Sequence, residues 1–122
     1  ILKLFPSIKR DVVDAVINSA NNIVMESFGS GNATNQEWFI NRLETALNNG
    51  KIIVNCSQCL AGNVKHGQYE TSSDLEHIGI ISAQDMTTES AIVKLMYLSG
   101  TTESLDKRKS LFRKNLRGEI ST

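Results

Sequence analysis

The chain has 122 residues, of which 40% are hydrophobic and 21% are charged, and its formal net charge is zero. These values are typical of one globular domain and exclude a disordered segment. A neutral chain without an apolar run of roughly 20 residues gives no reason to expect a nucleic acid or a membrane as partner.

The chain begins with Ile1 rather than Met, inside the apolar run ILKLF. We therefore expect it to be one part of a longer protein, with sequence upstream of it. The run is too short for the apolar core of a signal peptide. Two cysteines are too few for a disulfide framework, which favours a reducing, cytoplasmic compartment.

In the first third of the chain, short apolar runs alternate with an amphipathic segment. Residues 1–5 predict a strand, which the proline that follows would close. Ser7 is placed to cap a helix whose apolar face recurs at helical spacing over residues 12–20. Residues 23–25 predict a buried strand, and a loop at 26–33 follows it.

The middle of the chain repeats this order. TNQE at residues 34–37 has the capping-box pattern and predicts a helix that Gly50 ends. Residues 52–54 predict a third strand. The segment that follows, as far as residue 69, has no clear periodicity and includes both cysteines.

The last third predicts three helices and one strand. A short helix begins near residue 71, and a very short strand follows at residues 80–81. A threonine-capped helix begins at 87 or 88 and is predicted to end at Gly100. A last amphipathic helix covers about 103–116.

Strands alternate with helices along the whole chain, as in proteins built from βαβ units. We therefore predict an α/β fold, with a single domain over residues 1–122. Its three layers are a four-stranded parallel sheet and flanking helices, as in a small Rossmann-like domain. In such sheets, ligands bind at the carboxyl ends of the strands. The loops expected there are residues 26–33, 55–62 and 82–86.

Cys56 and Cys59 stand at C-x-x-C spacing in the second of these loops, so a metal site, a redox site and simple packing are all alternatives. Zinc normally needs four ligands, and the two histidines, His66 and His77, complete no zinc-finger spacing. A redox site needs a helix directly after the motif, where residues 60–63 predict a turn. Packing is the favoured interpretation, and we expect no metal.

Other patterns also have a structural and a functional interpretation. GSGN, residues 29–32, lacks the third glycine of G-x-G-x-x-G and the lysine of a Walker loop. It is either a tight turn or a loop in which Asn32 faces a small polar ligand. DMTTE at 85–89 favours a helix cap over a site, and the basic residues of 107–117 favour a solvated helix face. No nucleophile with a matching base is recognisable.

Residues 52–98 contain three motifs in series: roughly V-N-x-[ST]-Q-C-x-x-G-x-V, then G-x-Y-x-T, then D-M-T-x-E before a helix. Three flanking segments accompany them, LFPSI at 4–8, FGSGNA at 28–33 and KNLRGE at 114–119. Together they resemble the C-terminal domain of cytoplasmic (type I) L-asparaginases. The resemblance covers essentially the whole chain, in the right order and spacing.

The resemblance implies the C-terminal domain of an amidohydrolase that converts L-asparagine to L-aspartate and ammonia without a metal or cofactor. In that family the catalytic threonines and a Thr-Asp-Lys relay belong to an N-terminal domain, which this chain lacks. No catalytic residue is assigned here, and the domain alone should be inactive. The implied partners are its own N-terminal domain and further copies, in a homodimer or a dimer of dimers whose active sites it helps to enclose.

Some cytoplasmic members of the family also bind L-asparagine at a separate effector site in this domain. The matching positions, as effector or subunit contacts, are Asn32, Ser57 and Cys59, with Glu26, Gly31, Asn55 and Gln58 as weaker candidates. Allosteric bacterial relatives carry an arginine at the position of Glu26. A glutamate there would repel the effector carboxylate, so effector binding is either lost or uses other contacts.

Three alternatives to an asparaginase domain stay open. The first is a non-catalytic effector-binding or interaction module of the same fold. The second is the asparaginase-like subunit of a tRNA-dependent amidotransferase, which shares the domain but acts on another substrate. The third is a redox or zinc protein that uses the C-x-x-C motif.

Overall fold

The computed structural model of the chain describes residues 1–28, 34, 36–57 and 70–121. Its strands are β1 (Leu2–Lys3), β2 (Asn22–Ser27), β3 (Ile52–Ser57) and β4 (Ile81–Ser82). Its helices are α1 (Arg10–Asn18), α2 (Glu37–Asn48), α3 (Glu70–Ile78), α4 (Thr88–Thr101) and α5 (Leu105–Phe112). Strands and helices alternate from β1 to α4, as the sequence predicts.

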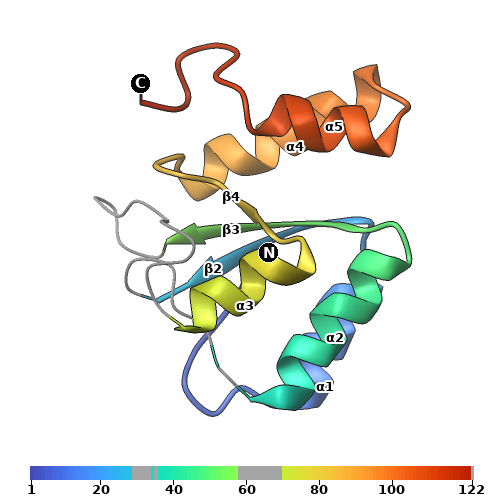
Figure 1. The fold of residues 1–122 in the computed structure, drawn as a ribbon, viewed down its shortest axis with the longest axis vertical. Coiled ribbons are helices and arrows are strands. Elements are labelled where there is room, and N and C mark those ends of the chain that lie inside the picture. Colours follow the sequence, from blue (N-terminus) through green and yellow to red (C-terminus); the bar gives the residue numbers. More distant parts are fainter. Residues whose placement is uncertain (29–33, 35, 58–69, 122) are drawn as a thin grey trace.

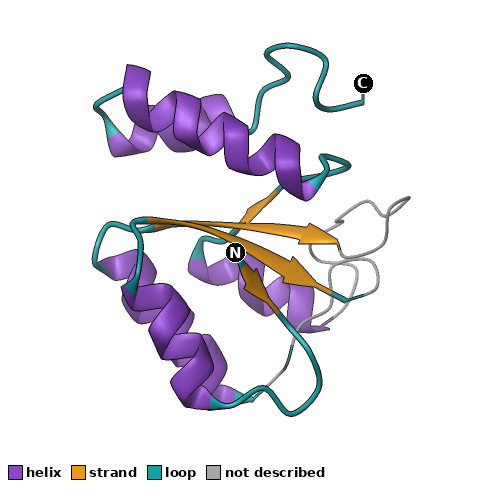
Figure 2. Cartoon of the chain, turned by 180° about the vertical axis from the view of Figure 1, so that it is seen from behind, coloured by secondary structure: helices purple, strands orange, loops and turns teal. Residues whose placement is uncertain are grey.

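The four strands form one parallel sheet in the order β1-β2-β3-β4. Helices α1, α2 and α3 cover one face of the sheet, and α4 and α5 cover the other (Figure 1, Figure 2). The expected three-layer α/β fold with a four-stranded parallel sheet is confirmed. Among the described residues, no helix has both the length and the apolar character needed to cross a bilayer.

Side chains on β2 and β3 alternate between the two faces of the sheet. Ile23 and Ile53 are register partners that point toward the α1–α3 layer, where Phe39 of α2 is fully buried. Val24 and Val54, the next pair in register, point toward the α4–α5 layer. Both faces of the sheet are therefore buried, which explains why these strands read as continuous apolar runs.

β2 and β3 both extend beyond the apolar residues that predicted them. Their parallel pairing covers six register pairs, the last of which is Ser27 with Ser57. The predicted strands at 23–25 and 52–54 are therefore too short. The polar residues at the ends of these strands belong to the sheet and not to the loops after them.

Two predicted helix caps are wrong. Ser7 lies two residues before the observed N-cap of α1, Lys9, and adopts a left-handed conformation with φ 68°. Thr34 forms no capping box, because the N-cap of α2 is Gln36. The Thr34 hydroxyl instead accepts a hydrogen bond from the backbone N–H of Gln36 at 3.4 Å.

The boundaries of the last two helices are set by local contacts that the sequence shows only in part. Thr87 caps α4 as predicted, since its side chain accepts a hydrogen bond from the backbone N–H of Ser90 at 3.1 Å. α4 continues one residue past Gly100, which does not adopt the left-handed conformation that ends a helix, so the predicted stop is wrong. The predicted helix at 103–116 is too long, because the chain leaves α5 after Phe112.

Candidate functional site

Polar side chains gather where β2, β3 and β4 end. Parallel strands bring their carboxyl ends to one edge of the sheet, the place where ligands bind in such folds. Ser27 pairs in register with Ser57, and Asn55 pairs with Ser82. All four alternate onto the face that α1–α3 cover, and Ser27 and Asn55 are fully buried. We call these four residues the polar edge.

Hydrogen bonds to the backbone hold this edge in place. The Ser27 hydroxyl donates to the carbonyl oxygen of Cys56 at 3.3 Å. The Ser82 hydroxyl accepts from the backbone N–H of Gln84 at 3.0 Å, where the chain adopts a left-handed φ of 54°. The loop expected at 82–86 therefore begins with a tight turn at the end of β4. The Ser82 hydroxyl takes part in that turn.

Glu26 and Cys56 are register partners that lie on the opposite face, toward α4. Burial, followed by the carboxylates of Glu26 and Glu89, raises the pKa of the Cys56 thiol to about 12. Such a thiol stays protonated at neutral pH, whereas metal binding and nucleophilic attack need the thiolate. Cys56 is fully buried in the α4–α5 core, as a packing residue would be.

The structure separates site residues that the sequence groups together. Ser57 and Asn55 lie on the polar edge, whereas Glu26 points to the other face of the same strand ends. The remaining candidates lie outside the described residues: Asn32, Gly31, Gln58 and Cys59. Sequence reasoning did not single out Ser27 or Ser82, although both lie in the loops that it expected at the strand ends, 26–33 and 82–86.

Basic side chains that could activate a nucleophile lie elsewhere. His77, the histidine in the described part of the chain, is exposed near the end of α3. Because α3 leads into a parallel strand, its end lies at the amino edge of the sheet, opposite the polar edge. Lys51 precedes β3 at that same amino edge, where its Nζ donates to the carbonyl oxygens of Ile17 (2.5 Å) and Ala20 (2.8 Å).

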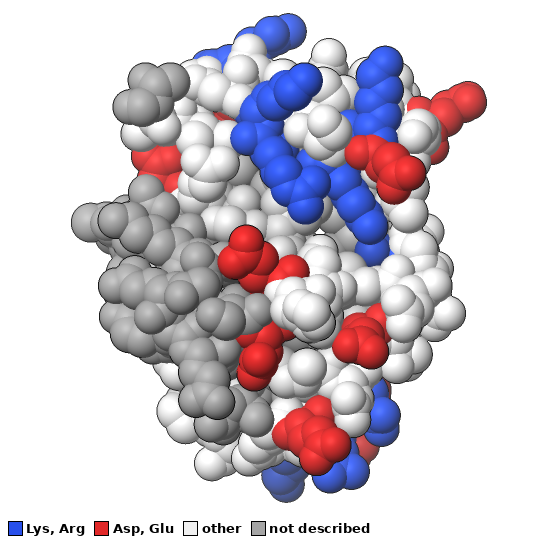
Figure 3. Space-filling view, viewed as in Figure 1, with Lys and Arg blue, Asp and Glu red and all other residues white. Residues whose placement is uncertain are grey.

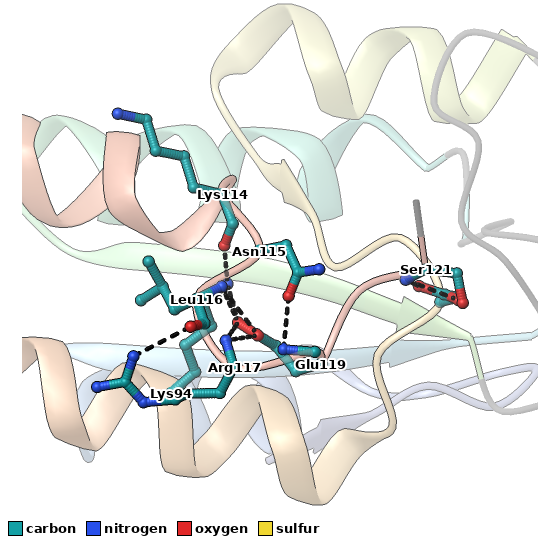
Figure 4. Close-up of polar contacts among 9 residues, drawn as sticks. Lys94, Lys114, Asn115, Leu116, Arg117, Glu119 and Ser121 are labelled. Carbon is teal, nitrogen blue, oxygen red and sulfur yellow. Dashed lines mark hydrogen bonds and ion pairs between the residues drawn. The ribbon is translucent and has the colours of Figure 1, made fainter.

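Lys94 of α4 and Glu119 of the C-terminal segment form an ion pair that is largely shielded from solvent, with Nζ and Oε1 3.1 Å apart and side chains 6% and 13% exposed (Figure 4). Lys94 also donates to the carbonyl oxygen of Lys114 at 2.5 Å. The Glu119 carboxylate accepts hydrogen bonds from the backbone N–H groups of Leu116 (2.7 Å) and Arg117 (3.0 Å). We call this set of contacts the tail lock.

Burial alone would raise the pKa of the Glu119 carboxyl, but the backbone N–H groups of Arg117 and Leu116 and the Lys94 ammonium outweigh it and lower the pKa to about 2. Buried Lys94 and half-buried Glu119 thus both have hydrogen-bond partners, which such an ion pair needs if it is not to destabilise the fold. The tail lock fixes the C-terminal segment against α4, and this segment carries Ile120 into the α4–α5 core.

A groove of about 810 Å³ lies between α4, α5 and the C-terminal segment. Its apolar walls come from Val93, Tyr97 and Leu98 of α4, Leu111 of α5 and Leu116. Both charged residues of the tail lock also line it. The groove shares no lining residue with the polar edge, so the two are separate features of the domain.

Replacing Glu119 with Gln should lower the free energy of unfolding at pH 7 by about 1–3 kcal/mol, because Lys94 would stay buried without a counter-ion. The pKa of Glu119 is about 2 in the folded protein, below its ordinary 4.5. Its stabilisation is therefore complete above pH 4.5 and is lost as the pH falls toward 2. Denaturant unfolding of both proteins at several pH values measures this, and the two stabilities should converge at acid pH.

Glu103→Gln is the matched control for this substitution, because Glu103 is exposed between α4 and α5. Its effect should stay within about 0.5 kcal/mol. An effect of Glu119→Gln no larger than the control would contradict the tail lock. So would a difference that does not shrink on acidification.

Cys56 should resist thiol reagents in the folded protein near neutral pH, since its thiol is buried and protonated. In a Cys59→Ser background, a colorimetric thiol reagent should detect about one thiol only after denaturant is added. The Cys56→Ala, Cys59→Ser double variant gives the background signal. Fast labelling of the native protein would instead revive a redox site at the C-x-x-C motif.

Residues 1–112 match the family model for the glutaminase/asparaginase C-terminal domain. L-asparaginase 1 of Escherichia coli is 33% identical over 122 residues, which cover 99% of this chain and 36% of the relative. The 60 kDa lysophospholipase of Homo sapiens is 40% identical over 123 residues, covering 99% of this chain and 21% of the relative. A glutamyl-tRNA(Gln) amidotransferase subunit of Pyrococcus abyssi is 32% identical over 122 residues, covering 99% and 27%.

Solved structures show the same relationship. L-asparaginase I from Vibrio cholerae O1 biovar eltor has a TM-score of 0.91 and 35% identity, covering 99% of this chain and 37% of that one. The thermostable L-asparaginase from Thermococcus kodakarensis has a TM-score of 0.90 and 29% identity, with the same coverage. The chain thus spans between 21% and 37% of the length of these relatives. It belongs to the glutaminase/asparaginase C-terminal domain family.

Proposed function

We propose that this chain is the C-terminal domain of a cytoplasmic amidohydrolase that converts L-asparagine to L-aspartate and ammonia. The main support is the match of 99% of the chain to about a third of an L-asparaginase I structure, at a TM-score of 0.91. On this proposal an N-terminal domain supplies the catalytic residues. This domain then contributes to subunit assembly and to the enclosure of a neighbouring active site.

The chemistry of the described residues supports this division of labour. Amide hydrolysis through a hydroxyl nucleophile needs an adjacent base and an oxyanion site. The polar edge offers hydroxyl groups, but His77 and Lys51 lie at the opposite edge of the sheet. Lys94 is engaged in the tail lock, and Cys56 stays protonated. His77 and Lys51 are therefore remote from the polar edge, Lys94 is engaged, and Cys56 is unreactive.

The polar edge is the best candidate for an effector or subunit contact within this domain. Ser57 lies there with Asn55, and Asn32 and Cys59 complete the set that the resemblance assigns. Hydroxyl and amide groups can hydrogen-bond both the carboxylate and the side-chain amide of L-asparagine. Because Glu26 points to the other face, its charge is a weaker objection to effector binding than the sequence suggests.

The relatives differ in what their names say they do, so the substrate has to be tested directly. One is named an L-asparaginase, one a lysophospholipase and one a subunit of a glutamyl-tRNA(Gln) amidotransferase. Identity to this chain does not rank these relatives, since it is 33%, 40% and 32% in that order, so the amidotransferase subunit and the lysophospholipase are both alternatives for the parent protein.

The full-length protein that carries this chain should release ammonia from L-asparagine, whereas the 122-residue chain alone should release none. Coupled detection of ammonia measures both, with L-glutamine and a lysophospholipid as comparison substrates. Ammonia release that requires charged tRNA would favour the amidotransferase. Fatty-acid release without ammonia would reject the amidohydrolase proposal.

If the polar edge binds an effector, Ser57→Ala should weaken L-asparagine binding to the full-length protein about fivefold, the cost of one lost hydrogen bond of roughly 1 kcal/mol. Glu26→Gln should leave the affinity within about twofold, because its side chain points away from the polar edge. Calorimetric titration in a catalytically inactive background separates this binding from turnover.

Ser19→Ala is the control for the calorimetry, since the Ser19 hydroxyl is exposed and bonds the carbonyl oxygen of Val16 at the end of α1. It should leave the affinity unchanged. Wild-type protein that shows no effector heat would remove the effector role. An equal loss in Ser57→Ala and Ser19→Ala would argue against the polar edge as the binding site.

A further inference from the structure

The end of the C-terminal segment is held at three successive residues, each by a different part of the domain. The Glu119 carboxylate pairs with Lys94 of α4 in the tail lock. Ile120 is buried and belongs to the α4–α5 core. The backbone N–H of Ser121 donates to the two carboxylate oxygens of Asp85, at 3.0 and 3.2 Å (Figure 4). We call these three successive residues the strap.

Asp85 lies in the turn that follows β4. Residues 83–86 form this turn, in which the backbone N–H of Met86 donates to the carbonyl oxygen of Ala83 at 3.0 Å. Gln84 has φ 54° there, a left-handed conformation that is unfavourable for a residue with a side chain. Such a residue keeps this conformation where the surrounding contacts impose it. The turn is therefore strained and depends on the contacts around it.

Two sets of contacts hold the strained turn. On one side, the Ser82 hydroxyl of the polar edge accepts from the backbone N–H of Gln84 at 3.0 Å. On the other side, Asp85 accepts from the strap. The first and last residues of the turn also belong to the same buried cluster as Ile120. The turn thus lies between the polar edge and the strap and connects them.

The charges around the strap favour its docked position. Figure 3 shows Lys and Arg side chains gathered at the end of the molecule built from α4 and α5, and the C-terminal segment belongs to that end (Figure 1). Hydrogen bonds from the Ser121 side chain and backbone lower the pKa of the Asp85 carboxyl, and the pKa of Glu119 is about 2. Both carboxylates are therefore ionised at neutral pH, and ionised acceptors form stronger hydrogen bonds than neutral ones.

We propose that the strap holds the turn, and with it Ser82 of the polar edge, in the strained conformation, so that docking of the strap and binding at the polar edge reinforce each other. Detachment of the strap removes the contact at Asp85 and lets Gln84 relax. The Ser82 hydroxyl then loses the N–H donor that fixes it. The strap is a regulatory element in this arrangement, because its displacement from α4 loosens polar side chains on the opposite face of the sheet.

The link to ligand binding rests on the effector role proposed above for the polar edge, whereas the action of the strap on the turn stands without it. Coupling between two sites is reciprocal, so each event favours the other by the same factor. A ligand at the polar edge should therefore lower the detached fraction of the strap by the factor by which the docked strap tightens binding.

Hydrogen exchange in the full-length protein without ligand tests the action of the strap on the turn. In Asp85→Ala, the peptide that covers the turn should exchange about fivefold faster than in the wild type, because the acceptor for Ser121 is lost. Glu119→Gln should also speed this exchange, although position 119 is not part of the turn. Glu103→Gln and Asp106→Ala are the matched controls, since both carboxylates are exposed in the same layer. They should change exchange at the turn less than about twofold.

Relief of the strain separates the action of the strap from general unfolding. Glycine adopts the left-handed backbone without a steric cost, whereas alanine keeps that cost. In the Asp85→Ala background, Gln84→Gly should therefore return exchange at the turn to within about twofold of the wild type, and Gln84→Ala should not. Unchanged exchange in Asp85→Ala, or equal exchange with glycine and with alanine at position 84, would overturn the proposal.

Calorimetry with L-asparagine in a catalytically inactive background tests the coupling to the polar edge. Glu119→Gln should weaken binding about threefold, and bound L-asparagine should slow exchange at the wild-type strap by a similar factor. Equal affinity of Glu119→Gln and the wild type would contradict the coupling. Wild-type protein without binding heat would reject the effector role and the coupling with it, while faster exchange in Asp85→Ala would still support the action of the strap on the turn.

Discussion

The handedness of parallel crossovers determines how this domain has to be built. Right-handed connections between strands added in one direction place all their helices on one face of the sheet. The order β1-β2-β3-β4 therefore puts α1, α2 and α3 together on one face. The other face carries buried Val24, Val54 and Ile81, and among the described residues it is the part of the chain after β4 that covers it. α4, α5 and the C-terminal segment supply that cover, and the tail lock holds the segment in place.

Much of the fold could be predicted from short apolar runs separated by glycines and polar turns, because each strand is buried on both faces. Because both faces are buried, an apolar run such as Ile23 to Met25 does not show which side chains point to which face of the sheet. The sequence therefore places Ser57, Asn55 and Glu26 at the correct strand ends but cannot show that Glu26 points away from the others. Lys94 lies on the buried side of α4, whose sequence is mainly apolar. Its partner Glu119 is 25 residues further along the chain, so the sequence pattern around either residue does not predict this ion pair.

The two surfaces of interest lie on opposite sides of the sheet and have different chemistry. The polar edge joins hydroxyl and amide groups held by backbone hydrogen bonds, which suits recognition of a small polar molecule or a subunit contact. The groove between α4, α5 and the C-terminal segment joins apolar side chains of both helices with the charged pair Lys94 and Glu119.

The late position of the covering layer has a consequence for biosynthesis. During translation the α1–α3 layer can close as soon as β4 has left the ribosome. The opposite face stays open until α4 and α5 emerge, and its cover is complete only with Ile120, which is 6% exposed and belongs to the same core. Nascent or truncated chains that end before α4 would expose Val24, Ile52, Val54 and Ile81 on this face, and chaperones and proteases should recognise such chains first.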